Sequence, residues 1–554
     1  MTNSWGGPPG PRGSPRTRSA PEKPARAPAA DRGVRPTGLA ALLLWCTAAA
    51  AQTPVIVISI DTLRADHLSA YGYRAISTPN IDAFARNGTL FTDVNSQIPL
   101  TLPSHTSLFT STWPFQNGIE ENGEVVPAGA VTLASVLQSR GYKTAAFIGS
   151  SLLGRGAGLD RGFDEYDSPF GSPAAGAESP YSTRVRRDGA LVLRAATQWL
   201  TAHKGQPAFV FIHLFDLHAP YRLHQVPGSA LPETVGYDAE IGYVDQIMGR
   251  FEQALEQNGW WQRSLIVLLA DHGESLGEHG ESSHGYFAYQ STLHVPLIVH
   301  WPDGSQNYPA RTTKAAGLID VAPTILEALH LPPQSSFEGA SLMKFDETPA
   351  HAVYSESVYA RDQFRWAALR ALRIGQWKLV DAPRAELYDL EKDPRELSNI
   401  VRANSAEATT LRAELSKLLA RYASNGKAPV TPKLDTSNGT RTALESLGYL
   451  SGNQRNKSAT DGPDPKDRLP EYRLFEKSLD AFYAHRLDAA ISGLRRVLAQ
   501  DAGNLPARGT LGQVYLSAGK PEAAVREWKA ALGVDPAFTP AAEALAEYEK
   551  LQKK

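Results

Sequence analysis

Three apolar segments that lie far apart in the chain each end in acidic or histidine residues. They are Val55–Ile60 before Asp61, Phe209–Phe215 before Asp216 and His218, and Leu265–Ala270 before Asp271 and His272. Uninterrupted apolar runs of this length are typical of parallel strands that are covered on both faces. The carboxyl ends of parallel strands meet at one edge of a sheet, where ligands bind in open α/β folds. The three endings therefore predict one functional site.

Helix-like stretches separate these segments. They are Pro79–Asn87, Ala130–Gly141, Val185–His203 and Asp238–Gln257. Strands that alternate with helices predict an α/β fold with a mainly parallel central sheet. A single Asp at a strand–helix junction can instead cap a helix, and that alternative stays open for Asp61 and Asp216.

The segment Ser264–His284 holds the densest cluster of metal-capable side chains in the chain. After the apolar run come Asp271, His272, Glu274, Glu278, His279, Glu281 and His284. With Asp61, the Asp271–His272 pair supplies oxygen and imidazole ligands that suit Ca²⁺, Mg²⁺, Mn²⁺ or Zn²⁺. We expect a divalent cation here; the alternative is a solvated, histidine-rich loop.

The stretch Gln97–His105 offers hydroxyl groups in a Pro-rich turn before the helix-like segment His105–Thr110. A hydroxyl such as that of Thr101 at a helix entrance gains from the positive end of the helix dipole. Coordination to a divalent cation would lower its pKa enough to make a nucleophile. The alternative is that Thr101 only caps the helix.

The chain has 554 residues, more than one hydrophobic core accommodates. With 56 basic and 58 acidic residues, it has no charge asymmetry that would indicate a nucleic-acid partner. Residues 1–35 are rich in Pro, Arg and Ala and predict a disordered tail. Residues 36–52, with the apolar run Leu39–Ala51, predict a signal peptide or an anchor. We therefore expect export to a periplasm, or anchoring that faces it.

The C-terminal part reads as a linker followed by a repeat. Residues 426–466 are rich in Gly, Ser, Pro and Asn. Within 467–554, the segment Ala484–Ile491 returns as Ala518–Val525, a 34-residue period. This period resembles that of tetratricopeptide repeats, with about two and a half helix pairs. The alternative is a plain helical bundle. So short an array favours docking to a protein partner or packing on its own enzyme.

The chain from about Pro54 to Ala423 resembles the sulfatase family of the alkaline-phosphatase superfamily. The resemblance rests on VISIDTLRADHLSAYGY, STPNIDAFARNGTLFTDV, PLTLPSHTSLFT, FDLHAPY, LADHGESLGEHG, HVPLIVHWP and ELYDLEKDPRELSNI. It implies an alkaline-phosphatase-like catalytic domain over 53–340 and a small antiparallel subdomain over 341–425.

The resemblance also implies a metal-dependent hydrolase of anionic esters. Asp61, Asp271 and His272 would then bind the cation, with Thr101 as the nucleophile. His105 would stand near the bound anion. His218 and His284 would protonate the leaving group or hold substrate oxygens.

Three departures from the family pattern bear on the chemistry. Family sulfatases carry Cys or Ser in C-x-P-S-R and convert it to formylglycine, whereas this chain has Thr101 and His105 in TLPSH. Oxidation of threonine would leave a ketone, so we expect no formylglycine. Gly149–Leu153, GSSLL, stands where family sulfatases often show G-K-W-H. Thr62 replaces a second metal-binding Asp, which makes calcium less assured.

These departures favour phosphoester chemistry, because related phosphodiesterases and phosphotransferases use a threonine. Asp216, His218 and His284 could form part of a second metal site. A true sulfuric ester hydrolase stays open as an alternative. So does a catalytically weak binding protein that acts through the repeats.

Overall fold

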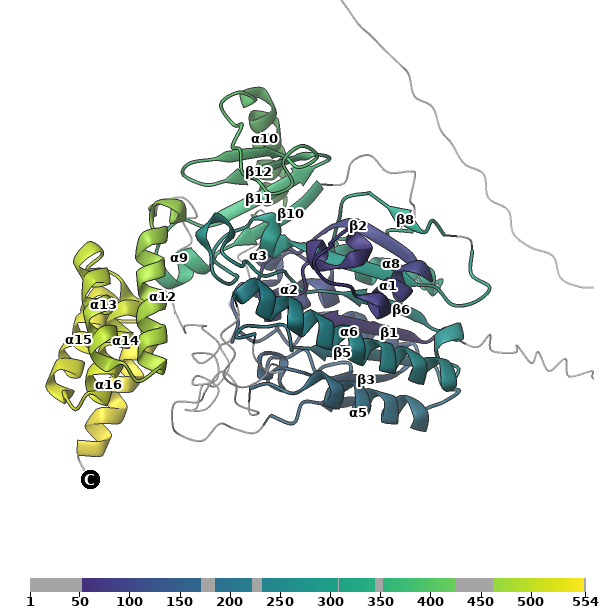
Figure 1. Ribbon diagram of the computed structural model, residues 1–554, viewed down its shortest axis with the longest axis horizontal. Coiled ribbons are helices and arrows are strands. Elements are labelled where there is room, and N and C mark those ends of the chain that lie inside the picture. The colour runs from purple at the N-terminus through teal and green to yellow at the C-terminus, as the bar shows by residue number, and fades with distance from the viewer. Residues whose placement is uncertain are drawn as a thin grey trace, which may run out of the picture. The chain divides into compact units, whose positions relative to one another are not determined.

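The structure is a computed structural model, and it describes residues 52–170, 185–221, 232–306, 308–343, 352–423 and 462–552 (Figure 1). The predicted tail, nearly all of the predicted signal peptide or anchor, and most of the predicted linker lie outside these residues. Among the helices that are described, none is long and apolar enough to cross a bilayer. Export therefore stays a prediction.

The central sheet has the strand order β4-β3-β5-β1-β6-β7-β2-β8, and β9 pairs with β2 (Figure 1). Its strands are β1 (Val55–Ile60), β2 (Thr89–Asn95), β3 (Lys143–Phe147), β4 (Glu165–Asp167), β5 (Ala208–Leu214), β6 (Leu265–Leu269), β7 (His294–His300), β8 (Arg311–Thr312) and β9 (Ala316–Gly317). β1 pairs in parallel with β5 on one side and β6 on the other, whereas β7 is antiparallel to β6. The three predicted strands are thus neighbours, and the mainly parallel sheet is confirmed.

The α-helices of the described residues in this part of the chain are α1 (Pro79–Arg86), α2 (Thr101–Thr110), α3 (Pro114–Asn117), α4 (Leu133–Ser139), α5 (Gly189–Ala202), α6 (Glu233–Gln257), α7 (Gln290–Leu293) and α8 (Val321–Ala328). Four of them, α1, α4, α5 and α6, overlap the predicted stretches between the strands, whereas α3, α7 and α8 were not predicted. α2 begins at Thr101, earlier than the predicted His105. Pro103 falls in the first turn, where a missing N–H costs no intrahelical hydrogen bond. The second half of the Pro-rich stretch, from Thr101, is therefore part of the helix, whereas Pro99 precedes it.

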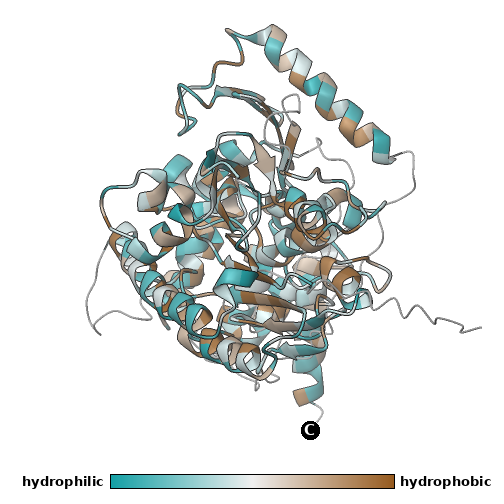
Figure 2. Cartoon of the chain, turned by 90° about the vertical axis from the view of Figure 1, so that its right-hand side faces the viewer, coloured by the Kyte–Doolittle hydropathy of each residue, from teal (hydrophilic) through white to brown (hydrophobic). Residues whose placement is uncertain are grey.

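A second, antiparallel sheet follows, as the resemblance implied. Its strands are β10 (Ala352–Ser357), β11 (Leu369–Ile374), β12 (Trp377–Asp381) and β13 (Glu386–Asp389), with α9 (Tyr359–Phe364) after β10. The closing helix α10 (Ser405–Ala423) is the helix at the top of Figure 2, where hydrophobic and hydrophilic residues alternate along it. Ala408, Leu411 and Leu415 are its buried residues. One apolar stripe of α10 thus covers the small sheet.

Five further helices form the C-terminal region. They are α12 (Leu469–Tyr483), α13 (Leu487–Gln500), α14 (Leu505–Ser517), α15 (Pro521–Val534) and α16 (Thr539–Gln552). The starts of α13 and α15 lie one 34-residue period apart. Phe475 of α12 belongs to the same buried cluster as Tyr286 and Trp366, and residues 51–554 form one compact unit. These helices therefore share a hydrophobic core with the preceding part of the chain.

Gly149 follows β3 at the edge of the sheet that carries the predicted site. The backbone of a neighbouring strand approaches it closely. A Cβ there would lie 2.6 Å from the His213 carbonyl oxygen and 3.1 Å from the Phe215 nitrogen, both backbone atoms of the β5 region. We expect Gly149→Ala to lower the free energy of unfolding by about 1–3 kcal/mol, measured by urea denaturation. Gly129→Ala is the matched control, because a Cβ at Gly129 meets no atom within 4 Å. Equal stability of the two variants would contradict this packing.

Candidate active site

The carboxyl edge of β5, β1 and β6 gathers the predicted ligands. Asp61 follows β1, and its backbone N–H donates to the Leu214 carbonyl at the end of β5 (2.9 Å). Asp271 and His272 follow β6 after a single residue. All three side chains are fully buried. Parallel pairing of the three strands thus brings residues that are about 200 positions apart in sequence to one place.

Thr101 is the first residue of α2, which is buried along its whole length. The N-cap is Leu100, and no side chain caps this helix. The Thr101 hydroxyl has no hydrogen-bond partner, although it lies close enough to the Asp61 carboxylate to lower the pKa of Asp61. The alternative that Thr101 serves as a helix cap is therefore wrong, and its hydroxyl is available for another role.

Several buried polar atoms at this edge have no hydrogen-bond partner. Among them are Asp61 Oδ1, Thr101 Oγ1, Asp271 Oδ2 and His272 Nε2. Ligand atoms of Asp61, Asp271 and His272 all lie within 4.8 Å of one another. Buried polar groups are almost always satisfied in folded proteins, so a group of this kind indicates a missing ligand. Two carboxylate oxygens, an imidazole nitrogen and a hydroxyl fit a divalent cation.

The electrostatics of the two carboxylates indicate the same ligand. Burial raises the pKa of Asp61 to about 6, although the nearby His272 opposes this shift. Burial and the charge of Asp61 raise the pKa of Asp271. Two buried like charges destabilise each other's ionised form. A cation between them would remove this repulsion and keep both ionised at neutral pH.

Two buried histidines, His213 and His105, lie against the predicted cation ligands. His213 Nε2 lies 3.1 Å from Asp61 Oδ2, and His105 Nδ1 lies 2.7 Å from the Thr101 carbonyl oxygen and 3.6 Å from Asp271 Oδ2. The other nitrogen of His105 is hydrogen-bonded to Ser59 Oγ (2.9 Å). Burial lowers the pKa of both histidines to about 4, so both are neutral at pH 7. This geometry favours a positioning role for His105 rather than direct contact with an anion.

Sequence reasoning missed His213. It interrupts an otherwise apolar strand, and the parallel register pairs it with Ser59 of β1. A polar residue within a strand that is buried on both faces needs a partner, which is the signal that could have singled it out.

A second group of histidines borders the ligands. The His284 ring lies 4.4 Å from the His272 ring and 5.0 Å from the His218 ring, measured between centroids. His284 Nδ1 is hydrogen-bonded to Glu274 Oε1 at 2.8 Å. Burial lowers the pKa of His218 well below its ordinary value. The structure thus brings His218, His272 and His284 together, as the sequence predicted.

Arg186 is a second residue that sequence reasoning missed. Its guanidinium lies over the Phe215 ring (5.1 Å) and donates to the His218 carbonyl (2.8 Å). It also lies 3.1 Å from His218 Nδ1. It is a buried positive charge beside the histidine group, where an anionic substrate needs one. Arg186 lies in a stretch without a recognisable motif, so the sequence did not indicate it.

Asn122 is the third residue that was missed. Its Oδ1 accepts a hydrogen bond from the backbone N–H of Leu102, the residue after Thr101 (2.9 Å). Its Nδ2 is buried and has no partner. An amide N–H held beside the nucleophile position can donate to an oxygen of a bound substrate. No pattern in the sequence connects Asn122 to Thr101.

The residues suggested for a second metal site do not assemble into one. Asp216 Oδ1 accepts from the backbone N–H of Gly189, at the start of α5 (3.0 Å). Among the described residues, the three-ligand groups are Asp61–Asp271–His272 and His105–His213–Asp271. Neither group includes Asp216, His218 or His284. Asp216 therefore accepts a hydrogen bond at the start of α5, but the N-cap of this helix is Asp188, so the N-cap alternative for Asp216 is wrong.

The two other departures from the family pattern are visible in the structure. Thr62 has a left-handed backbone (φ 57°), its N–H donates to Asp271 Oδ1 (3.3 Å), and its hydroxyl is buried without a partner. Ser150 Oγ accepts from the backbone N–H of Leu152 (3.3 Å). These positions therefore bring no charged side chain to the site.

Comparison with known families assigns most of the chain. Residues 53–331 match the sulfatase family, and residues 277–425 match the family described as N-sulphoglucosamine sulphohydrolase, C-terminal. Residues 481–548 match a tetratricopeptide repeat family. The chain belongs to the sulfatase family and is a hydrolase of that family, with tetratricopeptide repeats at its C-terminal end.

Individual relatives agree with this assignment. An N-acetylglucosamine-6-O-sulfatase of Bacteroides thetaiotaomicron is 24% identical over 479 residues, which cover 66% of this chain and 85% of the relative. Arylsulfatase A of Bos taurus is 24% identical, covering 60% of this chain and 75% of the relative. Among solved structures, a phosphonate monoester hydrolase of Agrobacterium radiobacter has a TM-score of 0.55 at 22% identity, covering 67% of this chain and 96% of that chain. The last likeness supports the fold.

A divalent cation should stabilise the protein in a pH-dependent way. Because burial raises the pKa of Asp61 from 3.8 to about 6, the cation-free folded state binds this proton more tightly than the unfolded chain does. Stability of the cation-free protein therefore falls as pH rises from about 4 through about 6. The cation binds the ionised carboxylates, so the increase in Tm on adding it should be largest above pH 6 and should decline below it.

Thermal unfolding with EDTA or with added Ca²⁺, Mg²⁺, Mn²⁺ or Zn²⁺, near pH 5 and near pH 8, measures this. Asp61→Asn is the control, and it should abolish the increase at both pH values. An increase in Tm as large near pH 5 as near pH 8 would count against Asp61 as a ligand.

Proposed function

We propose that this sulfatase-family hydrolase cleaves phosphate or phosphonate esters, with Thr101 as the nucleophile. The observation that carries the proposal is the convergence of unpartnered buried atoms of Asp61, Asp271 and His272 beside the Thr101 hydroxyl. A divalent cation held there would supply the positive charge that favours ionisation of this hydroxyl. Position at the first residue of α2 adds the favourable end of the helix dipole.

In the first step, Thr101 Oγ attacks phosphorus, and the bond between phosphorus and the leaving oxygen breaks. The leaving oxygen needs a proton, and we assign its donation to His284, whose Nδ1 is fixed by Glu274. In the second step, water cleaves the Thr101 ester and releases the acid. We assign the orientation of the oxygens of the transferred group to Asn122 Nδ2 and Arg186, since Asn122 bonds the residue after Thr101 and Arg186 lies beside His218.

The residue at position 101 is the reason to prefer phosphorus over sulfur. A threonine keeps its hydroxyl and cannot become the aldehyde on which family sulfatases depend, so direct attack is the route open to it. Two solved structures with a similar fold are titled as phosphonate monoester hydrolases, from Agrobacterium radiobacter and Silicibacter pomeroyi. They support the proposal only in showing that this fold occurs with such activity.

Sulfuric ester hydrolysis is the second candidate. The relatives named above are sulfatases. One structural neighbour is titled as bound to its substrate, D-glucosamine-2-N,6-O-disulfate. A screen of the purified protein against phosphate monoesters, phosphate diesters, phosphonate esters and sulfate esters, each with Ca²⁺, Mg²⁺, Mn²⁺ or Zn²⁺, separates the candidates. Fastest turnover of the sulfate ester would overturn the preference for phosphorus.

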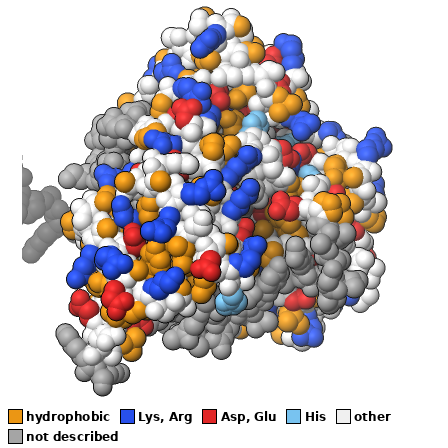
Figure 3. Space-filling model, turned by 60° about the vertical axis from the view of Figure 1, so that its left-hand side comes forward, with side chains coloured by type: hydrophobic (Ala, Val, Ile, Leu, Met, Phe, Trp, Pro, Cys, Tyr) orange, Lys and Arg blue, Asp and Glu red, His pale blue; other side chains and the backbone are white. Residues whose placement is uncertain are grey.

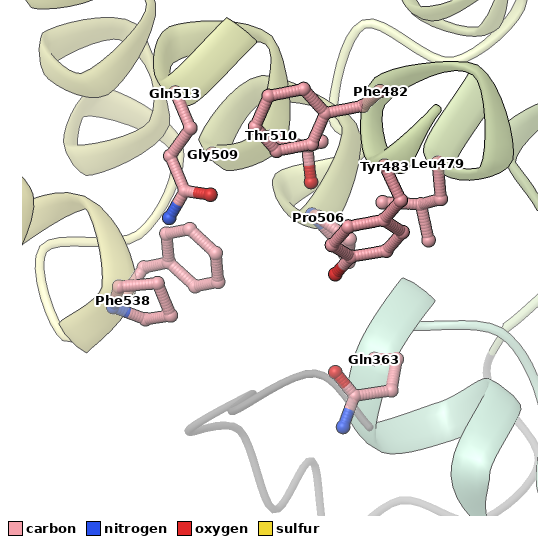
Figure 4. A pocket seen from close by; sticks show the side chains of 10 residues that line it. Gln363, Leu479, Phe482, Tyr483, Pro506, Gly509, Thr510, Gln513 and Phe538 are labelled. Carbon is pink, nitrogen blue, oxygen red and sulfur yellow. The ribbon is translucent and has the colours of Figure 1, made fainter. Parts of the chain in front are cut away.

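The third candidate function is that of a binding protein without turnover, which would act through the repeats. A groove there is lined by Phe482 and Tyr483 of α12, by α14, by Phe538 and by Gln363 of α9 (Figure 4). Aromatic and amide side chains face this groove and would suit a peptide. A protein partner for the repeats stays a prediction. A binding role alone would not require the buried ligand set.

Thr101→Ala should lower kcat by several orders of magnitude at unchanged fold, because the covalent step is lost. Thr106→Ala is the matched control on the same helix, since Thr106 Oγ1 donates only to the Leu102 carbonyl (2.8 Å). We expect the control to cost about 1 kcal/mol of stability and to leave kcat nearly intact. Thr101→Ser should keep phosphoesterase activity. Near wild-type turnover by Thr101→Ala would show that another group performs the attack.

A further inference from the structure

The segment that carries His284 has no strand or α-helix, and its regular structure is one short 3-10 turn over Glu278–Gly280. Gly277, His279, Gly280 and Gly285 all have left-handed backbone conformations, so residues 277–285 form an irregular loop. Ser275, just before this loop, donates its N–H to the Ser283 carbonyl (2.8 Å). An irregular loop of this kind needs contacts from outside to hold one side chain within a fraction of an ångström.

Helix α12, the first helix of the repeats, supplies such contacts along the outer side of this loop. Arg473 Nε donates to the Gly280 carbonyl (2.7 Å), and Ser282 Oγ donates to Glu476 Oε2 (3.0 Å). A Cβ on Gly280 would lie 2.3 Å from the Arg473 guanidinium, and the left-handed backbone of Gly280 (φ 87°) also favours a glycine there. The two polar contacts of α12 thus hold the loop on the side of Gly280 and Ser282.

Aromatic packing continues this interface at the end of the loop. The Tyr286 ring stacks on the Tyr472 ring with centroids 4.1 Å apart and planes 13° apart. Tyr286 Oη donates to the carbonyl of Pro465, which lies just before α12 (2.6 Å). Tyr286 is fully buried. His284 therefore sits between two anchor points, Ser282 and Tyr286, that are both held by the repeat region.

The inner side of the same loop faces the active site. His284 Nδ1 bonds Glu274, and the His284 ring borders those of His272 and His218. A displacement of the loop on its α12 side therefore moves the proposed proton donor relative to the leaving group. Basic and acidic side chains are interspersed over the face of the molecule in Figure 3.

We infer that Arg473 and Glu476 of the first repeat helix are positioning residues for His284, so that the repeats form part of the catalytic apparatus. This inference rests on the proposed function, in which His284 protonates the leaving group. Without the α12 contacts, His284 would be misplaced while the nucleophile and its cation ligands would remain in position. The rate should therefore fall for substrates with poor leaving groups, which need a proton, and change little for substrates with good leaving groups.

The test compares two aryl esters of the acid that the wild type hydrolyses fastest in the substrate screen. One carries 4-nitrophenol, a good leaving group, and the other carries phenol, a poor one. The variant Arg473→Ala/Glu476→Ala should lower kcat about tenfold for the phenyl ester and about twofold or less for the 4-nitrophenyl ester. Tm should change little. Arg473→Lys, which retains a donor, should recover most of the phenyl ester rate.

The matched control is Lys477→Ala/Asp480→Ala, which removes one charge of each sign from exposed positions of the same helix. It should leave both rates unchanged. If the full double variant fails to fold, Arg473→Ala alone should show the same selective loss to a smaller degree. A purely structural role of α12 would lower both rates together, and that result would overturn the inference.

His284→Ala in the same assay separates this inference from the proposed function. His284→Ala could lower kcat for the phenyl ester selectively while Arg473→Ala/Glu476→Ala behaves like the control. In that case the positioning role is wrong and the proposed function stands. If His284→Ala shows no dependence on the leaving group, the assignment of His284 as proton donor fails, and the positioning role fails with it.

Discussion

Two carboxylates, Asp61 and Asp271, are buried side by side at the end of adjacent parallel strands, and the organisation of the site follows from this arrangement. Burial raises the pKa of both groups, and the charge of Asp61 raises the pKa of Asp271 further. A folded protein tolerates such a pair when a cation or protons neutralise it. The unpartnered atoms of Thr101 and His272 beside the pair complete the ligand set. The same cation that stabilises the pair would activate the hydroxyl.

Much of this site could be predicted from the sequence because acidic and histidine residues directly follow apolar strands. An apolar run followed by Asp61, or by Asp271 and His272, locates a ligand at a sheet edge once the strands are parallel. Asp216 follows the same pattern, yet it bonds the start of α5. Local sequence cannot separate the two outcomes, because a helix terminus and a cation both attract a carboxylate.

The residues that sequence reasoning missed act through tertiary contacts. Asn122 reaches Leu102 from a loop, and Arg186 reaches His218 from a stretch before α5. The start of α2 was missed for a local reason, since Pro103 reads as a helix breaker but is tolerated in a first turn. The 34-residue period predicted the repeats correctly. It could not predict that Tyr472 would stack on Tyr286 of the catalytic loop, because such packing depends on both surfaces.

Trapping the covalent intermediate tests the central claim most directly. The wild type and Thr101→Ala would be mixed with an excess of the preferred phosphate or phosphonate ester and quenched in acid during turnover. Mass spectrometry of the peptides would then locate the transferred group. The account predicts an adduct on Thr101 in the wild type and none in the variant. Turnover without any adduct, or an adduct on another residue that persists in Thr101→Ala, would contradict it.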